Sequence, residues 1–134
     1  MWIMLEYLSM LSPTLNLQVG DVESIPLVDA DRDNIEKMVQ DNIDISKEDW
    51  DSFETSWDFQ HHLLLRKVSI ISEAFDQWQN ECEDRFNQMK DNEEELNRIF
   101  IDIYGLQDEL TPEVEDKDVT VRKADLGRDI RSFI

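Results

Sequence analysis

The sequence predicts a mainly α-helical protein whose long helices form an antiparallel hairpin or bundle, with a small extended element near the N-terminus. First, only three glycines and three prolines interrupt the 134 residues, a composition that favours helices. Second, apolar residues recur every seven positions between residues 68 and 104. Third, four tryptophans and six phenylalanines supply large side chains for a core, which argues against full disorder.

Residues 1–28 are expected to form the end of an upstream domain, made of a short helix and extended segments. Trp2–Leu11 is apolar and fits a short helix or the end of a strand, which Ser12-Pro13 interrupts. Apolar and polar residues alternate over Leu15–Val19, which predicts a strand. The pieces that follow are predicted as a turn at Gly20-Asp21 and a second extended piece at Val22–Val28, with Pro26 confining it to an edge.

Residues 29–134 are expected to form an acidic helical spacer domain. Its first helix begins at about Asp29, capped by Asp31 or Asp33, and presents an apolar stripe of Ile35, Met38 and Val39. Ser46 has the side chain of an N-cap and predicts the start of another helix, which runs to Trp57. The side chains on one face of that helix, predicted to stack into a core, are Trp50, Phe53 and Trp57.

The dominant feature is the seven-residue repeat, which predicts a long helix or a hairpin over residues 68–104. Arg85 and Asn92 replace apolar residues of the repeat, so they mark a loop, a kink or a polar layer. A break is expected at Asp91–Glu95, which would give two antiparallel helices, and Gly105 is placed as the C-terminal cap. The two rows of the repeat are Val68, Phe75, Cys82, Met89, Leu96 and Ile103, and Ile71, Trp78 and Ile99.

After Gly105, residues 106–119 are predicted to be an acidic loop that contains Thr111-Pro112. A further helix is expected to start within residues 123–134. Over Asp125–Ile134 it would place Leu126, Ile130 and Phe133 on one face.

The net charge of −19 limits the classes of function that the sequence favours. A strongly acidic surface repels phosphate, so direct contact with nucleic acid is disfavoured. The charge suits a solvated spacer, a basic protein partner or a mimic of DNA. The single cysteine, Cys82, allows no disulfide within the chain and fits a cytoplasmic location. The apolar start, Met1–Leu11, is too short to span a bilayer, so no membrane association is expected.

Several features of the sequence are candidate sites. His61-His62 are adjacent and point in different directions on a helix, so a metal site there is disfavoured. Asp29, Asp31 and Asp33 alternate as in a calcium loop, but no glycine follows at the required place. Cys82 lies on the apolar seam, where a buried structural thiol is the default.

The two other features bear on nucleic acid. Trp50, Phe53 and Trp57 could stack on bases, but the acids around them would repel the phosphate backbone, so core packing is preferred. The basic cluster is interpreted as charge balance for the acidic loop before it. No catalytic, cofactor-binding or metal-binding residue is therefore assigned. The members of the basic cluster are Arg122, Lys123, Arg128 and Arg131.

Residues 12–27, 49–59, 96–110 and 129–134 form four stretches that together resemble large adenine-specific DNA methyltransferases of the type IIG and phage-exclusion (BREX, PglX-like) kind. Residues 12–22, SPTLNLQVGDV, followed by Ile25-Pro26-Leu27, resemble the family signature NPTxNFQVGDIxxIP, with Ser12 and Leu17 as departures. The other three stretches are DWDSFETSWDF at residues 49–59, LNRIFIDIYGLQDEL at 96–110 and DIRSFI at 129–134. Their order and spacing cover nearly the whole chain.

The resemblance implies a parent enzyme that transfers a methyl group from S-adenosylmethionine to the exocyclic amine of adenine. The family's catalytic Asn-Pro-Pro-Tyr motif and its glycine-rich cofactor loop do not occur in this sequence. The chain is therefore interpreted as a non-catalytic helical spacer within such an enzyme. Its expected partners are the rest of that methyltransferase and other defence-system subunits, with DNA contacted through the parent alone. The alternative is a stand-alone acidic interaction module or DNA mimic.

Overall fold

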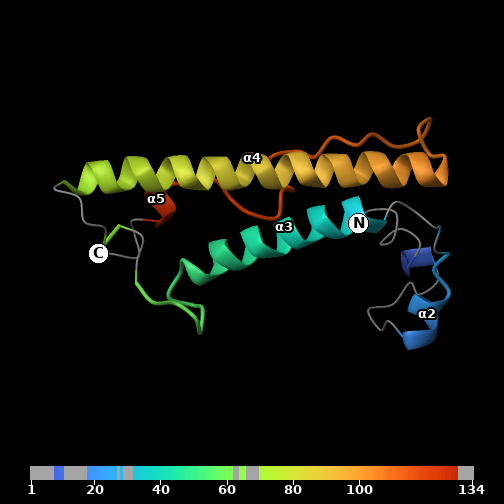
Figure 1. Cartoon of the computed structure of the whole chain (residues 1–134), viewed down its shortest axis with the longest axis horizontal. Helices are drawn as coiled ribbons and strands as arrows, with labels where there is room; N and C mark the ends of the chain where they lie inside the picture. Colours follow the sequence, from blue (N-terminus) through green and yellow to red (C-terminus); the bar gives the residue numbers. More distant parts are fainter. Residues whose placement is uncertain are drawn as a thin grey trace.

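The computed structural model describes residues 8–10, 18–26, 28, 32–61, 64–65 and 70–129, and these ranges contain helices but no strand. The mainly helical fold predicted from the sequence is confirmed. Figure 1 shows the long helix α4 with α3 lying along it. The labelled elements are α2 (Val19–Glu23), α3 (Arg32–Asp51), α4 (Ile71–Tyr104) and α5 (Leu126–Asp129).

The helix α4 is unbroken over 34 residues, which corresponds to about 51 Å at 1.5 Å per residue. It ends at Gly105, whose φ of 67° is left-handed, as the predicted cap requires. The predicted break at Asp91–Glu95 is wrong. The polar side chains of that stretch have partners instead: Glu93 and Glu94 accept hydrogen bonds from Thr120 and Val114.

The antiparallel pair is formed by α3 and α4, rather than by two halves of residues 68–104. The two helices run in opposite directions along each other (Figure 1). The partner-facing row of α3 has alternate spacings of three and four residues, which keeps it on one side of the helix. Its members are Ile35, Met38, Asn42, Ile45 and Asp49, each half-buried or buried.

The predicted helix start at Ser46 is wrong, because Ser46 lies inside α3. The apolar row continues through this position, and Lys47 forms an ion pair with Asp51 one turn later. The helix also ends at Asp51, six residues earlier than expected. Ser52 Oγ donates to the carbonyl of Asp49 at 2.6 Å, and turns follow.

This earlier end overturns the predicted aromatic core. Trp57 lies beyond the helix and is fully exposed, and Trp50 is 59% exposed on α3. Only Phe53 of the three is half-buried.

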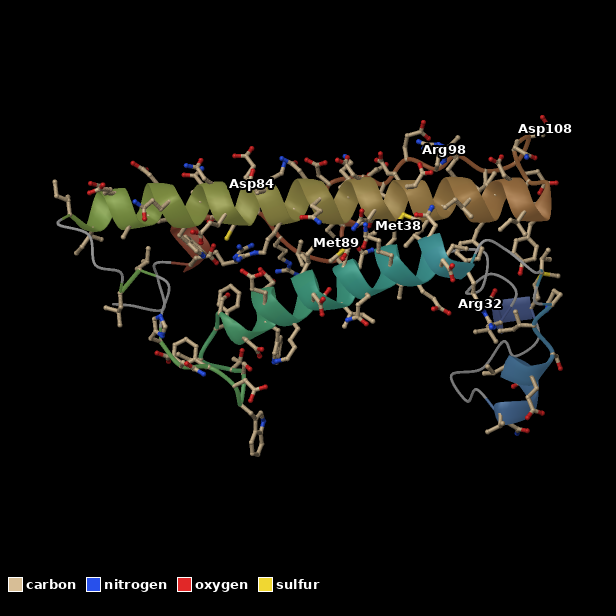
Figure 2. All side chains as sticks on the ribbon, viewed as in Figure 1. Arg32, Met38, Asp84, Met89, Arg98 and Asp108 are labelled. Carbon is tan, nitrogen blue, oxygen red and sulfur yellow. The ribbon has the colours of Figure 1, made fainter. Side chains whose placement is uncertain are left out.

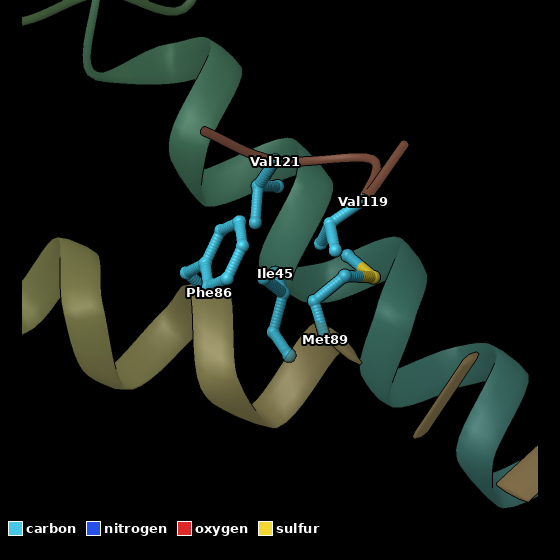
Figure 3. Close-up of a cluster of buried hydrophobic side chains, with 5 residues drawn as sticks. All are labelled: Ile45, Phe86, Met89, Val119 and Val121. Atoms are coloured by element: carbon cyan, nitrogen blue, oxygen red, sulfur yellow. The ribbon is translucent and has the colours of Figure 1, made fainter. Parts of the chain in front are cut away.

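Residues 106–125, here called the strap, run back along α4 (Figure 1). The strap is irregular, as the sequence predicted for its first part, but it contributes to the core. Val119 and Val121 are buried against Phe86 and Met89 of α4 and Ile45 of α3 (Figure 3). The core therefore lies between two helices and a strap, and α4 is contacted on two sides.

The extended elements predicted near the N-terminus are not found where the structure describes this region. Residues 8–10 are helical. Val19–Glu23 is the helix α2, so the turn at Gly20-Asp21 and the extended start at Val22 are wrong. The backbone N–H of Gln18 donates to the carboxylate of Asp21 at 3.0 Å, which favours a helix start. Residues 1–7 and 11–17, which include most of the predicted strand, lie outside the described residues.

The last helix begins close to the predicted place. Asp125 precedes α5, and its carboxylate accepts the backbone N–H of Arg128 at 2.7 Å. The rest of the predicted Asp125–Ile134 helix, from residue 130 on, lies outside the described residues. None of the helices within the described ranges is both long enough and apolar enough to cross a membrane.

Candidate functional site

The candidate site is the interface of α3 with α4, which mixes apolar and polar side chains. Figure 2 shows Met38 and Met89 between the two helices and Asp84 on the outer side of α4. The polar groups of this interface are here called the polar seam. Its members are Asn42, Glu48 and Asp49 of α3, and Arg85 and Asn92 of α4.

The two asparagines of the polar seam form one layer. Asn92 Nδ2 donates to Asn42 Oδ1 at 2.7 Å, and the pair is partly buried. A polar pair in an otherwise apolar seam fixes the register of two helices, because sliding by one turn would leave both amides without partners. Asn92 therefore belongs to a polar layer, which is one of the three alternatives (a loop, a kink or a polar layer) predicted for its position in the repeat.

Arg85 forms a second, charged layer. Its side chain is 10% exposed and donates from Nη1 to Glu48 Oε1 at 2.9 Å and from Nη2 to Cys82 Sγ at 3.3 Å. Its Nε is buried and has no hydrogen-bond partner among the residues that the structure describes. A buried guanidinium with incomplete hydrogen bonding lowers the stability of the interface relative to a well-packed apolar side chain. Arg85 therefore favours the one alignment of α3 and α4 in which it reaches Glu48.

Asp49 lies beside this layer. Burial raises the pKa of its carboxyl group, although the positive charges of Arg85 and Arg128 oppose the increase. The charge of Asp129 adds to it. A half-buried carboxylate held this way is a source of pH-dependent stability.

The prediction that Cys82 is a buried thiol is confirmed. It packs with Phe75 and Trp78 of α4 and with Leu64 and Ala124. Burial raises the pKa of its thiol, although Arg85 opposes this. A raised pKa disfavours the nucleophilic thiolate.

The basic cluster is largely neutralised by nearby acids, which agrees with the charge-balance interpretation. Lys123 pairs with Asp116 at 3.0 Å, and its ammonium lies 4.5 Å from the centre of the Phe86 ring. Arg128 pairs with Asp129 at 2.6 Å. Arg122 is exposed, and Arg131 lies outside the described residues.

An open hollow of about 640 Å³ lies where the end of α3 and the turns after it face Arg85 of α4. Exposed His61 lines it, together with Trp57, and His62 lies outside the described residues. Within the ranges the structure describes, no three His, Cys, Asp or Glu side chains are grouped to hold a metal ion. Asp33 lies in the first turn of α3, whereas Asp29 and Asp31 are not among the described residues.

The interface also contains two residues that the sequence analysis missed, Val119 and Val121 of the strap. They pack against Phe86 of α4, which lies outside both rows of the repeat and is 2% exposed. The alternation of Val119, Thr120 and Val121 could have predicted an extended segment with one buried face. The structure buries the two valines and leaves the threonine exposed. The arrangement holds two helices and the strap together in one register.

Comparison with known proteins finds two adenine-specific methyltransferases that are similar to this chain. The chain is 51% identical over 134 aligned residues to "Adenine-specific methyltransferase PglX" of Lacticaseibacillus casei (strain Zhang), which covers 96% of this chain and 11% of that protein. The resemblance to PglX-like adenine-specific methyltransferases is confirmed. "Adenine-specific methyltransferase BrxX" of Escherichia coli O9:H4 (strain HS) is 31% identical over 107 residues, 80% of this chain and 9% of that protein.

The chain thus spans about a tenth of the length of these PglX-like relatives. No protein-family model matches the sequence. Identity of 51% over nearly the whole chain indicates that the PglX relative contains a segment with the same helical fold.

Proposed function

We propose that this chain is a non-catalytic helical spacer of an adenine-specific, S-adenosylmethionine-dependent DNA methyltransferase in a phage-defence or restriction-modification system. It would hold the catalytic and target-recognition parts of the enzyme at a fixed separation. The observation that carries the proposal is α4, an unbroken 34-residue helix braced by α3 and the strap.

Bracing matters because an isolated helix frays and bends, whereas a helix packed on two sides resists both. The strap contacts α4 at several levels. Asn97 donates to the carbonyl of Pro112 at 3.1 Å, and Lys90 pairs with Asp116 at 2.8 Å. Together with the polar seam, these contacts favour one length and one register.

The chemistry is proposed to occur elsewhere in a larger polypeptide. The relatives are named as adenine-specific methyltransferases and are about ten times longer than this chain. The sequence contains neither the Asn-Pro-Pro-Tyr motif nor a glycine-rich loop. S-adenosylmethionine is the proposed cofactor of the parent enzyme, which would act in the cytoplasm with DNA and other defence subunits as its partners.

The acidic surface suits this role. The helix α4 carries ten acids and three bases. Outward-facing carboxylates repel the phosphates of DNA, so the spacer would not bind the duplex that its neighbours act on.

The test exchanges this chain for the corresponding segment of the Lacticaseibacillus casei relative. The chimera should methylate DNA. Asp91→Pro, at an exposed position in the middle of α4, removes a helix hydrogen bond and kinks the helix at a cost of about 3 kcal/mol. It should abolish site-specific methylation but leave S-adenosylmethionine binding by the chimera unchanged, whereas Asp91→Ala should preserve both.

Two results would count against the proposal. One is a chimera that methylates equally well with Asp91→Pro, because a spacer must be stiff. The other is micromolar binding of S-adenosylmethionine by the chain alone, measured by calorimetry, because a spacer has no cofactor site.

The net charge of −19 favours one second candidate, an acidic module that mimics DNA. The charge density argues against it. The net charge of α4 is −7 (ten acids and three bases) over about 51 Å, or one charge per about 7 Å, against one per about 1.7 Å along duplex DNA. A DNA mimic would displace DNA from a methyltransferase in a competition assay, and a spacer would not.

A further inference from the structure

Side chains of α4 hold the backbone of the strap. Glu94 Oε1 accepts the backbone N–H of Val114 at 3.1 Å. Glu93 Oε1 accepts the backbone N–H of Thr120 at 3.4 Å and also its hydroxyl group. Asn97 Nδ2 donates to a backbone carbonyl of the strap at 3.1 Å. Nearly every residue has these two backbone groups, so the backbone bonds fix the path of the strap without requiring particular side chains.

Two buried valines add contacts that do require particular side chains. Val119 and Val121 pack between α3 and α4, against Ile45, Phe86 and Met89 (Figure 3). The residue between the two valines is exposed, so burial alternates along this part of the strap. Hydrogen bonds to the backbone, combined with pockets for alternate side chains, are the means by which many proteins bind a peptide segment of a partner.

The other fastening of the strap is an ion-pair group in contact with solvent. Asp116 accepts from Lys90 of α4 at 2.8 Å and from Lys123 of the strap at 3.0 Å. Ion pairs that water and salt can reach contribute little to stability. The polar seam, by contrast, joins α3 to α4 without any residue of the strap. The two helices therefore keep contacts of their own when the strap leaves.

We infer that the surface beneath the strap is a peptide-binding groove that the strap occupies in cis. The strap is its autoinhibitory lid, and a segment of another protein with the same pattern displaces it. That pattern is a carboxylate three positions before two β-branched apolar residues at alternate positions, as in Asp116, Val119 and Val121. The inference goes beyond the spacer role and does not depend on it, because either occupant braces α4.

The test uses a labelled synthetic peptide with the sequence of residues 111–123, and binding is followed by fluorescence anisotropy. The 134-residue chain with Val119→Ser/Val121→Ser should bind it, because its own strap no longer fills the groove. A peptide in which the same two valines are serine should bind at least about tenfold more weakly. The unmodified chain should also bind the natural peptide at least about tenfold more weakly, since a tethered occupant competes at an effective concentration of about millimolar.

A charge-matched pair of further variants locates the peptide on α4. Glu93→Ala/Glu94→Ala, added to the double serine variant, removes the acceptors of the backbone N–H groups and should weaken binding by about tenfold or more. The control is Asp76→Ala/Asp84→Ala, which removes two exposed acids of the same helix. It should change the affinity by less than about twofold. Equal weakening by the two pairs would overturn the inference.

Hydrogen exchange on the unmodified chain tests the lid without any substitution in the core. The backbone N–H groups of Val114 and Thr120 should exchange when the strap alone opens, with protection at least about tenfold lower than that of Met89 in α4. This measurement decides the matter if circular dichroism shows that the double serine variant does not fold. Equal protection of the strap and α4 would show that the strap cannot leave by itself, and would overturn the inference.

Three other results would also contradict it. The first is no binding of the natural peptide to a folded double serine variant. The second is equally tight binding of the peptide that lacks the two valines, which would show non-specific attraction. The third is a dimer of the unmodified chain in light scattering that Val119→Ser/Val121→Ser dissociates, which would make the strap of a second copy the occupant.

Discussion

Asn92 of α4 donates a 2.7 Å hydrogen bond to Asn42 of α3, across fifty positions of sequence. The two amides meet in an interface whose other contacts are largely apolar, such as those of Ile45 with Met89. Apolar side chains tolerate a shift of one helix along another, whereas a paired amide does not. This pair is therefore the element that defines the register of α3 on α4.

Breaking the asparagine pair from one side should be worse than removing it altogether. We expect Asn92→Leu to lower the free energy of unfolding by about 1–2 kcal/mol, because Asn42 loses its partner inside the interface. The double variant Asn42→Leu/Asn92→Leu should be close to the unmodified chain or more stable. Urea unfolding of the two single variants and the double variant gives the coupling energy. Additive single effects would show that the pair is not formed in solution.

Met89 should be the most sensitive core position, because it is 1% exposed and contacts both α3 and the strap. Met89→Ala removes most of the side chain and should lower the free energy of unfolding by about 2–5 kcal/mol. The control is Ile71→Ala, an exposed position on the same helix, with an expected change within about 0.5 kcal/mol. Similar losses for the two variants would contradict the packing described here.

The strap should be held by its two buried valines. Val119→Ser/Val121→Ser removes two apolar side chains from the core and should cost about 3 kcal/mol or more. Limited proteolysis should then cut residues 106–125 faster than in the unmodified chain. The control is Asp118→Ala, an exposed strap position next to the valines, which keeps the apolar contacts and should leave the proteolysis rate nearly unchanged. A strap that stays protected in the double serine variant would show that its valines do not anchor it.

Asp49 should make stability fall as the pH rises. Burial raises its pKa above 3.8 in the folded state, so the folded protein holds this proton more tightly than the unfolded chain. Stability therefore declines as the pH rises from 3.8 through the raised folded-state pKa, and the full penalty remains above it. Asp49→Asn should match the unmodified melting midpoint at lower pH and exceed it at pH 7.

Asp51 is the matched control, because its pKa is lowered in the folded state whereas that of Asp49 is raised. Its hydrogen bond with Lys47 lowers its pKa, so its contribution is present above 3.8 and is lost as the pH falls through the lowered value. Asp51→Asn should therefore lower the melting midpoint at pH 7, by a small amount that salt reduces further. A lower midpoint for Asp49→Asn at pH 7 would contradict the role assigned to burial.

The sequence predicted α4 well because its signals are local and repeated. Phe75, Trp78, Cys82 and Met89 follow the seven-residue spacing and are buried as expected, and Gly105 ends the helix in the left-handed conformation. Ile71 of the same repeat is 77% exposed, because it is the first residue of α4. The predicted break at Asp91–Glu95 failed because it treated the polar residues that interrupt the repeat as an interruption of the helix. Asn92 has its partner on α3, and Glu93 and Glu94 have theirs on the strap, which no local pattern reveals.

The aromatic core at the end of α3 failed for a related reason. The spacing of Trp50, Phe53 and Trp57 fits a helix face, but Ser52 and Ser56 end the helix with side-chain hydrogen bonds. The burial of Val119 and Val121 depends on the return of the strap along α4, which is a tertiary feature. The polar seam was visible as two interruptions of the repeat, at Arg85 and Asn92, but the partners of those residues were not.

The most direct test of the central claim, a single stiff helix, is a distance measured along α4. Nitroxide labels are attached at Asp76→Cys and Asp102→Cys, which are both exposed positions, in a chain that also carries Cys82→Ala. The distance between the labels is measured by double electron–electron resonance. The 26 intervening steps predict one narrow distribution at about 39 Å between backbone positions. A much shorter distance, or two populations, would mean that residues 71–104 fold back on themselves and cannot act as a spacer.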